Sequence, residues 1–306
     1  MDQTQDLSAS RLSNAWAELQ AHARDHQPLD ADAYRLAFAD PEFLLRRETR
    51  GIRMQLEMLK PELSQHEQGI ENTVVVFGSA RFPAPETASA SLAAARANLA
   101  KVTASNAHDD TTVLALRDAQ DALMVAERHT RNARYYDQAR LFARLVATHS
   151  NALPLAEQLF ICTGGGPGIM EAANRGAHEL DAPTVGLNIV LPHEQSGNKY
   201  ITPSLNFKFH YFALRKMHFL MRAKALVAFP GGFGTLDELF EVITLVQTGK
   251  SKPLPIVLFG SDYWKRLINF EVLIEEGAIS PKDLDLFHYV DEPHEAWNII
   301  KGFYEL

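Results

Sequence analysis

Short apolar runs alternate with helical patterns along most of this chain, beginning near residue 73. Several runs are apolar at consecutive positions, which is typical of strands buried on both faces of a parallel sheet. The succession of strand and helix predicts an α/β fold, a Rossmann-like, doubly wound parallel sheet with helices on both faces. The predicted strands are residues 73–77, 159–162, 184–188, 225–229, 256–259 and 287–290, with 207–211 as a weaker seventh.

The first seventy residues differ from the rest because they contain no credible strand. Helix-favouring runs cover residues 12–23, 31–38 and 41–63. In the last run Ile52, Leu56 and Leu59 repeat at the spacing of one helix face, and such an apolar stripe must pack on something. We predict that residues 1–70 form a helical N-terminal extension. It would cover the Rossmann-like domain of residues 71–306 or a subunit interface.

The connection between the first two strands is much longer than the one helix of about 12–18 residues that a parallel crossover needs. It holds no glycine, and residues 86–153 are compatible with helix. We predict a helical hairpin inserted at residues 86–130, before a crossover helix at 132–148. A lid or an oligomer contact would both suit the hairpin, which carries no catalytic signature. Its predicted helices are 88–104 and 111–128, joined by a polar turn at 106–110.

Composition narrows the class of protein. A hydrophobic content of 46% and a charged content of 22% are ordinary for a globular protein, and the net charge of −8 speaks against a nucleic-acid partner. The one cysteine, Cys162, lies in an apolar run and can build neither a disulfide nor a zinc site, so we expect a buried filler in a reducing compartment. No apolar run reaches about 18 residues and the N-terminus is polar, so we expect a cytoplasmic protein without a membrane span.

The run Pro230-Gly231-Gly232-Phe233-Gly234-Thr235-Leu236-Asp237-Glu238 is the most informative motif. It follows one predicted strand and precedes an amphipathic stretch, 239–246, so it reads as strand, glycine loop and helix. Glycines let the backbone approach a ligand closely, and free N–H groups at a helix N-terminus favour a phosphate. Glu238 would lie one turn into that helix. Because a pure anion site gains nothing from a carboxylate, the motif predicts a site that also stabilises developing positive charge.

Two further loops follow predicted strands, where open α/β sheets bind ligands. The first is Gly78-Ser79-Ala80-Arg81, and the second is Gly164-Gly165-Gly166-Pro167-Gly168. The second is not a dinucleotide fingerprint, since the third glycine of that pattern would fall on Ile169, and no Gly-Lys-Ser/Thr follows it. Glycine loops without either signature suggest a mononucleotide or a sugar phosphate.

Cations and amides complete the candidate site. Arg215 and Lys216 begin a predicted helix, where positive charge opposes the helix dipole and needs another justification. We expect Arg215 to approach the same cleft as Glu238, whereas Lys216 fits a surface charge equally well. Residues 193–198 form a polar loop at the same pole, and Gln195 and Asn198 are its candidates for reading a base.

At this point the motifs resemble a known family. The run 76–81, the loop 164–170, and Arg215-Lys216 followed by the Pro-Gly-Gly-x-Gly-Thr-x-x-Glu element resemble the LOG ("lonely guy") family of cytokinin riboside 5′-monophosphate phosphoribohydrolases. Members were often labelled possible lysine decarboxylases. The resemblance covers roughly residues 73–304 and is closest to the longer bacterial members. The extension and the helical insertion are foreign to the short plant-type members.

The resemblance implies hydrolysis of a nucleoside 5′-monophosphate, of the AMP or N6-modified AMP type, without metal or cofactor, in a homodimer or higher homo-oligomer. It makes Arg215 and Glu238 the catalytic pair. Which base is preferred stays open. The substrate and phosphate ligands that we expect are Gly78, Ser79, Arg81, Gly164, Gly165, Gly166, Lys216, Gly231, Gly232, Gly234 and Thr235.

Two other readings compete with hydrolysis. Related folds bind phosphate-bearing pterin cofactors, so a non-catalytic nucleotide or cofactor carrier is the main alternative. A pyridoxal-phosphate decarboxylase would need a lysine presented to the phosphate pocket, and only Lys208 or Lys216 could serve.

Overall fold

The computed structural model describes residues 17, 19–22, 24–25, 31–104, 110–190 and 196–306. The chain divides into two compact units between Leu59 and Lys60. The predicted helix 12–23 lies largely outside the described residues. The elements that begin in the first unit are η1 (Asp32–Tyr34), η2 (Ala37–Ala39), α2 (Pro41–Leu45) and α3 (Arg50–Glu67).

The helical run predicted at 41–63 is interrupted, because α2 ends at Leu45 and α3 begins at Arg50. Asp40 caps α2 by accepting a hydrogen bond from the Phe43 N–H at 3.1 Å. The Thr49 hydroxyl lies within 3.0 Å of three carbonyl oxygens at the end of α2. The single hydroxyl hydrogen of Thr49 can therefore be donated to one of these carbonyls, which a continuous helix would have paired with backbone N–H groups. The residues of the predicted apolar stripe lie on α3 and are about half exposed, so the packing predicted for them stays a prediction.

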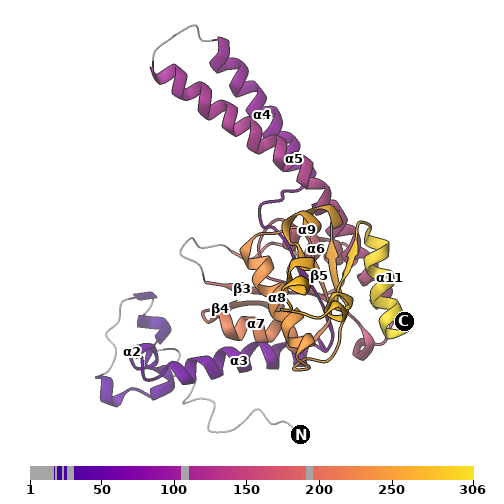
Figure 1. Cartoon of the computed structure of the whole chain (residues 1–306). Coiled ribbons are helices and arrows are strands. Elements are labelled where there is room, and N and C mark those ends of the chain that lie inside the picture. Colours follow the sequence, from indigo (N-terminus) through magenta and orange to yellow (C-terminus); the bar gives the residue numbers. More distant parts are fainter. Residues whose placement is uncertain (1–16, 18, 23, 26–30, 105–109, 191–195) are drawn as a thin grey trace. The chain divides into compact units, whose positions relative to one another are not determined.

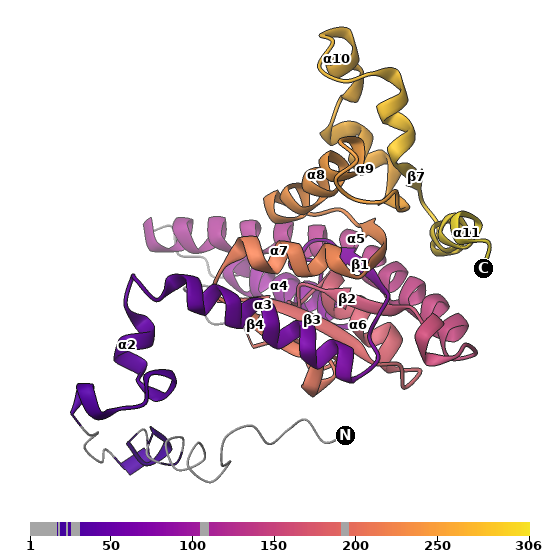
Figure 2. The same cartoon turned by 90° about the horizontal axis from the view of Figure 1, so that it is seen from below.

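Seven parallel strands form the sheet of the second unit, in the order β4-β3-β2-β1-β5-β6-β7. Figure 2 shows β4, β3, β2 and β1 side by side in that order. All seven predicted strands are confirmed, with ends that shift by at most two residues. The strands are β1 (Thr73–Phe77), β2 (Phe160–Thr163), β3 (Thr184–Ile189), β4 (Asn206–Phe209), β5 (Ala223–Ala228), β6 (Ile256–Phe259) and β7 (His288–Val290).

Helices cover both faces of this sheet, as the consecutive apolar residues of its strands predict. On one face Val74 and Val76 of β1 belong to a buried cluster with side chains of α5, α6 and α11. On the other face Phe77 packs edge-on against Phe219 of α7, with ring centroids 4.8 Å apart. The sheet is therefore doubly wound. Its remaining helices are η3 (Leu155–Glu157), α6 (Ile169–His178), η4 (Pro203–Leu205), α7 (Phe212–Met221), α8 (Phe233–Gln247), α9 (Ser261–Leu267), α10 (Phe270–Glu275), η5 (Pro281–Leu286) and α11 (Pro293–Tyr304).

The long connection between β1 and β2 consists of α4 (Pro85–Ala104) and α5 (Asp110–Ser150). The separate crossover helix predicted at 132–148 is wrong, since α5 runs unbroken for 41 residues, about 60 Å at 1.5 Å per residue. No proline or glycine interrupts it. The predicted turn at 106–110 lies outside the described residues except for Asp110.

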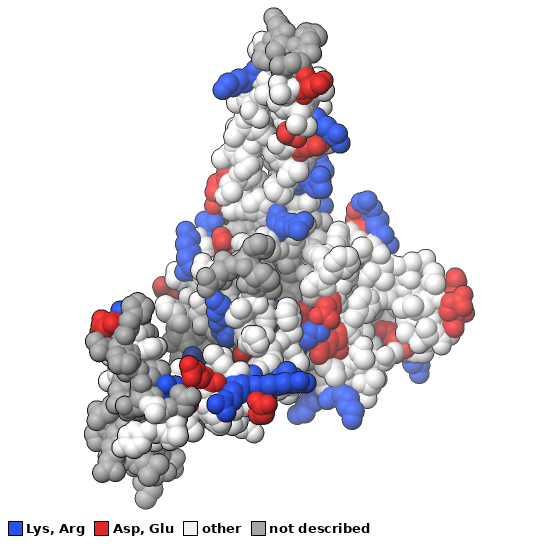
Figure 3. Space-filling view, turned by 90° about the vertical axis from the view of Figure 1, so that its left-hand side faces the viewer, with Lys and Arg blue, Asp and Glu red and all other residues white. Residues whose placement is uncertain are grey.

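Figure 1 shows α4 and the first half of α5 running side by side away from the sheet, and we call this pair the arm. In Figure 3 the charged side chains on the arm are scattered over a largely uncharged surface. Val113, Leu114 and Met124 of α5 are each more than half exposed.

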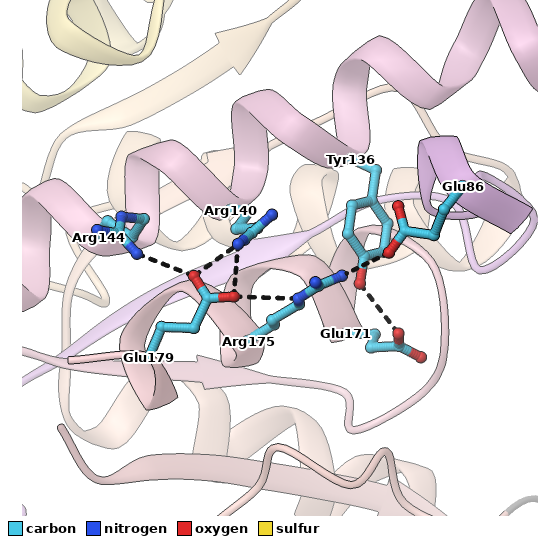
Figure 4. Close-up of polar contacts among 7 residues, drawn as sticks. All are labelled: Glu86, Tyr136, Arg140, Arg144, Glu171, Arg175 and Glu179. Carbon is cyan, nitrogen blue, oxygen red and sulfur yellow. Dashed lines mark hydrogen bonds and ion pairs between the residues drawn. The ribbon is translucent and has the colours of Figure 1, made fainter. Parts of the chain in front are cut away.

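A network of ionic side chains fastens the second half of α5 to α6 (Figure 4). Glu179, which follows α6, is held by Arg140 at 2.6 Å and by Arg144 at 2.9 Å, both from α5. Arg175 of α6 joins the same carboxylate at 3.1 Å and reaches Glu86 of α4 at 3.0 Å. Three helices are therefore fixed to one another at the point where the arm meets the sheet.

Cys162 is fully buried in β2, as predicted, and burial raises the pKa of its thiol to about 12. Over the described ranges, no helix is long and apolar enough to cross a membrane. The same ranges hold no group of three or more His, Cys, Asp or Glu side chains placed to bind a metal ion.

Candidate functional site

A cavity of about 730 Å³ opens at the carboxyl ends of β1 and β5. After β1 the chain builds the sheet towards β4, and after β4 it returns to add β5 on the other side of β1. Doubly wound sheets bind their ligands at this change of direction. All of its lining residues come from the second unit: Phe77, Gly78, Ser79, Ala80, Arg81, Phe82, Asn132, Met170, Phe212, Arg215, Gly231, Gly232, Phe233, Gly234, Thr235, Asp237, Glu238 and Tyr263.

The N-terminus of α8 supplies hydrogen-bond donors to this cavity. Leu236 is the first residue whose N–H donates within the turn, to the Gly232 carbonyl at 3.1 Å. The N–H groups of Phe233, Gly234 and Thr235 have no partner among the described residues. A Cβ added at Gly232 or Gly234 would meet no atom within 4 Å. Free donors beside open space form a cradle for an anion such as phosphate.

The loop before α8 is held tightly. A Cβ at Gly231 would collide with the Thr235 side chain, so only glycine fits there. The Gly231 carbonyl accepts a hydrogen bond from the Tyr263 hydroxyl at 2.5 Å. These contacts fix the loop that leads the chain from β5 into the anion cradle.

Gly234→Ala tests the cradle, because the alanine methyl group would occupy the open space without touching protein atoms. We expect the free protein to gain about 0.5–1 kcal/mol in stability, since alanine favours helix over glycine. The affinity for inorganic phosphate, measured by calorimetry, should weaken about tenfold or more, because the methyl group would take the space of an anion bound to these N–H groups. Gly302→Ala, in α11 and also next to open space, is the matched control and should leave binding unchanged. Unchanged affinity in Gly234→Ala would place the phosphate elsewhere.

Glu238 and Arg215 form a buried pair across the cavity floor. The Arg215 Nη1 and the Glu238 Oε1 lie 3.7 Å apart, and the two side chains are only 12% and 10% exposed. Among the described residues no donor makes a hydrogen bond to the Glu238 carboxylate. Burial raises the pKa of Glu238 to about 7, although Arg215 and Lys216 oppose the rise. This carboxyl can therefore change its protonation state near neutral pH.

Arg215 is held in place from several sides. Its Nε donates to the Leu187 carbonyl at 2.7 Å, and its guanidinium lies 5.1 Å from the centre of the Phe219 ring. A Cβ at Gly164 would come within 2.6 Å of its Nη2, so this glycine makes room for the guanidinium. Burial lowers the pKa of Arg215, and the charge of Glu238 counteracts the fall. Arg215 is the fourth residue of α7, because the helix begins at Phe212 and not at Arg215 as predicted.

The other predicted ligands divide into two groups. Of the first loop, Gly78, Ser79 and Arg81 line the cavity. Of the second, Gly164 touches Arg215, while Gly165 has a φ of +75° and no room for a Cβ beside Asn188. Glycines 164–166 are absent from the cavity lining, and of the three Gly164 is the one next to the Arg215 guanidinium.

Lys216 and Asn198 also lie outside the cavity lining. The Lys216 ammonium binds Asp237 at 2.8 Å and Glu241 at 3.1 Å, which ties α7 to α8. The Asn198 amide donates to the Gly166 carbonyl at 3.1 Å, so it holds the second glycine loop. Gln195, the other candidate for reading a base, lies outside the described residues.

Several residues that line the cavity are not among those predicted from the sequence. Asn132 comes from the middle of α5, and Tyr263 comes from α9 after β6. Phe212 and Met170 each occupy one of the first two positions of a helix that starts near a strand end. That proximity was the one signal available for these two, while nothing local marks Asn132 or Tyr263.

Solved structures similar to this chain include two proteins that handle a cofactor. The molybdenum cofactor binding protein from Rippkaea orientalis is 18% identical, with a TM-score of 0.38 over 56% of this chain and 88% of the other. The molybdenum cofactor carrier protein from Chlamydomonas reinhardtii is 18% identical, with a TM-score of 0.39 over 56% and 89%.

Sequence comparisons point to one family. Residues 170–300 match the family model described as "Possible lysine decarboxylase". The probable cytokinin riboside 5′-monophosphate phosphoribohydrolase LOGL5 of Oryza sativa subsp. japonica is 32% identical over 169 residues, 47% of this chain and 67% of that protein. The Arabidopsis thaliana enzyme LOG3 is 33% identical over 122 residues, 39% of this chain and 55% of that protein.

The chain covers only part of some relatives, 65% of rice LOG4 and 55% of Arabidopsis LOG3. The matched residues 170–300 nevertheless contain Arg215 and the whole glycine loop that leads to Glu238. With its parallel sheet and its match to LOGL5, the chain belongs to the LOG family.

Proposed function

We propose that this LOG-family chain hydrolyses the N-glycosidic bond of a nucleoside 5′-monophosphate, of the AMP or N6-modified AMP type. The products are the free base and ribose 5-phosphate. One observation carries the proposal: a single cavity combines the free N–H groups of α8 with the buried carboxylate of Glu238. An anion-binding site alone has no use for that carboxylate, whereas a sugar cation formed next to a bound phosphate does.

The reaction follows from the placement of these groups. The N–H groups at the start of α8 and the Thr235 hydroxyl bind the 5′-phosphate, which positions the ribose further along the cavity. Cleavage of the glycosidic bond gives the ribose oxocarbenium character. The ionised Glu238 stabilises this cation and orients or deprotonates the attacking water. The charge of Arg215 favours the ionised form of Glu238, and Arg215 assists the departing base or the phosphate.

The older decarboxylase label finds no support in the cavity. Pyridoxal phosphate needs a lysine for its Schiff base. No lysine is among the described residues that line the cavity, and the Lys216 ammonium is bound to two carboxylates. Purified protein should therefore show no pyridoxal absorbance band.

The test is a chromatographic assay of base release. Purified protein is incubated at pH 8 with AMP, N6-isopentenyl-AMP, GMP and CMP, and the free base is quantified against a sample without protein. We expect release from AMP or its N6-modified form. Release from none of the four, together with measurable nucleotide binding, would replace hydrolysis by a carrier function.

A further inference from the structure

Helix α5 contributes a side chain to the cavity as well as forming the arm. Asn132 lines the cavity with Phe82 and Tyr263, at the base of the arm. Its side chain is half-buried, and its amide forms no hydrogen bond with any described residue. The amide therefore offers a free donor and a free acceptor to whatever occupies the cavity.

The position of Asn132 is fixed by the residues one turn further along α5. The Tyr136 hydroxyl donates to Glu171 of α6 at 3.0 Å, within the ionic network of Figure 4. The Tyr135 ring stacks on Phe82 at 6.0 Å and lies within 3.1 Å of the Cβ position of Gly260. A helix anchored this way presents Asn132 in one place, which precise recognition requires.

The chemistry of the lining differs between parts of the cavity. The start of α8 provides backbone donors that suit a phosphate, and Glu238 with Arg215 suits the ribose. The lining also includes Phe82, Asn132 and Tyr263, which add two aromatic rings and a neutral amide. The Phe82 ring stacks on Tyr135, one turn from Asn132 on α5, while Tyr263 reaches back to the Gly231 loop. Aromatic rings stack on nucleobases, and an asparagine amide pairs with the N6 and N7 positions of adenine through one acceptor and one donor. An N6-substituted adenine keeps one N–H for this pairing.

We propose that Asn132 determines substrate specificity by binding the N6 and N7 edge of an adenine base. The inference rests on the proposed function for the identity of the substrate. It adds that α5 selects the base, so a residue outside the glycine loops decides between adenine and other bases.

Asn132→Ala tests the proposal by its selectivity. We expect kcat/KM for AMP to fall about tenfold to a hundredfold, because two hydrogen bonds to the base are lost. The values for GMP and CMP should change less than about threefold. Asn98→Ala makes the same change on exposed surface of α4 and should alter none of them. Circular dichroism and thermal unfolding of both variants check that the fold is intact.

Two outcomes would overturn the proposal. An equal loss for AMP, GMP and CMP would place Asn132 at the phosphate or ribose, which all nucleotides share. Unchanged kcat/KM values for AMP, GMP and CMP would show that Asn132 does not contact the substrate.

A binding measurement separates this inference from the proposed function. Calorimetry gives the ratio of AMP affinity to CMP affinity in Glu238→Gln and in Glu238→Gln/Asn132→Ala, and neither measurement needs turnover. We expect the ratio of AMP affinity to CMP affinity to fall in the second variant by about the factor by which Asn132→Ala lowers kcat/KM for AMP. The unmodified chain could release no base and yet prefer AMP in binding, with the preference lost in the variant that lacks Asn132. That result would contradict the proposed hydrolysis but support the role of Asn132 in binding the base.

Discussion

Replacing Glu238 with glutamine is expected to reduce base release from AMP at pH 8 by about a thousandfold or more, while AMP affinity changes less than about fivefold. Glutamine has nearly the same shape but no charge, so it cannot stabilise the sugar cation or activate water, and such groups contribute several orders of magnitude to rate. In the proposed mechanism the phosphate stays bound, because the substitution leaves the free backbone N–H groups at the start of α8 unchanged. The loss therefore belongs to kcat.

The measurements are single-turnover base release and calorimetric AMP binding. Glu241→Gln is the matched control: it makes the same change one turn further along α8, where the carboxylate is 33% exposed and pairs with Lys216. This control should keep at least about a third of the normal rate. Near-normal turnover in Glu238→Gln would remove Glu238 from the chemistry, and a loss of AMP binding would make it a ligand instead.

The sheet and the anion cradle were predictable because their signals are local. Strands such as 73–77 are apolar at consecutive positions, and that pattern follows directly from burial on two faces. Gly231, Gly232 and Gly234 stand between a strand and a helix, so the cradle could be placed without tertiary information. Glu238 lies next to it for the same reason, because a helix fixes the position of a residue one turn away.

The rest depends on packing between distant segments. Asn132 reaches the cavity because α5 continues past the predicted end of the hairpin, and helix-compatible residues alone do not say where two helices are separate. Tyr263 lines the cavity because β6 is a neighbour of β5 in the sheet. In the sequence, the loop at Gly164 has the pattern of a second phosphate-binding loop, yet in the structure Gly164 lies against the Arg215 guanidinium. A glycine that makes room for a side chain and one that makes room for a ligand look alike in sequence.

The burial of Glu238 in the cavity also makes the free energy of unfolding depend on pH, and this effect can be measured without substrate. Burial raises the pKa of Glu238 from an ordinary value of 4.5 to about 7, and the side chain is only 10% exposed. A carboxyl whose pKa is higher in the folded state contributes its full stability below pH 4.5 and loses it as the pH rises through 7. The shift corresponds to about 3 kcal/mol lost from the folded protein by pH 8.

Glutamine at this position is neutral at every pH, so Glu238→Gln does not lose this stability as the pH rises. We expect its free energy of unfolding to exceed that of the unmodified chain by about 3 kcal/mol at pH 8 but by only about 1 kcal/mol at pH 5. Urea titrations followed by circular dichroism at both pH values measure the difference. In Glu241→Gln the difference should not grow by more than about 0.5 kcal/mol between them, because that carboxylate is more exposed and already paired. A pH-independent difference in Glu238→Gln would show that its carboxyl ionises normally in the fold. If the difference in free energy of unfolding grows with pH, the fold loses stability by burying the charged Glu238 carboxylate. Away from water, such a carboxylate acts most strongly on a cation.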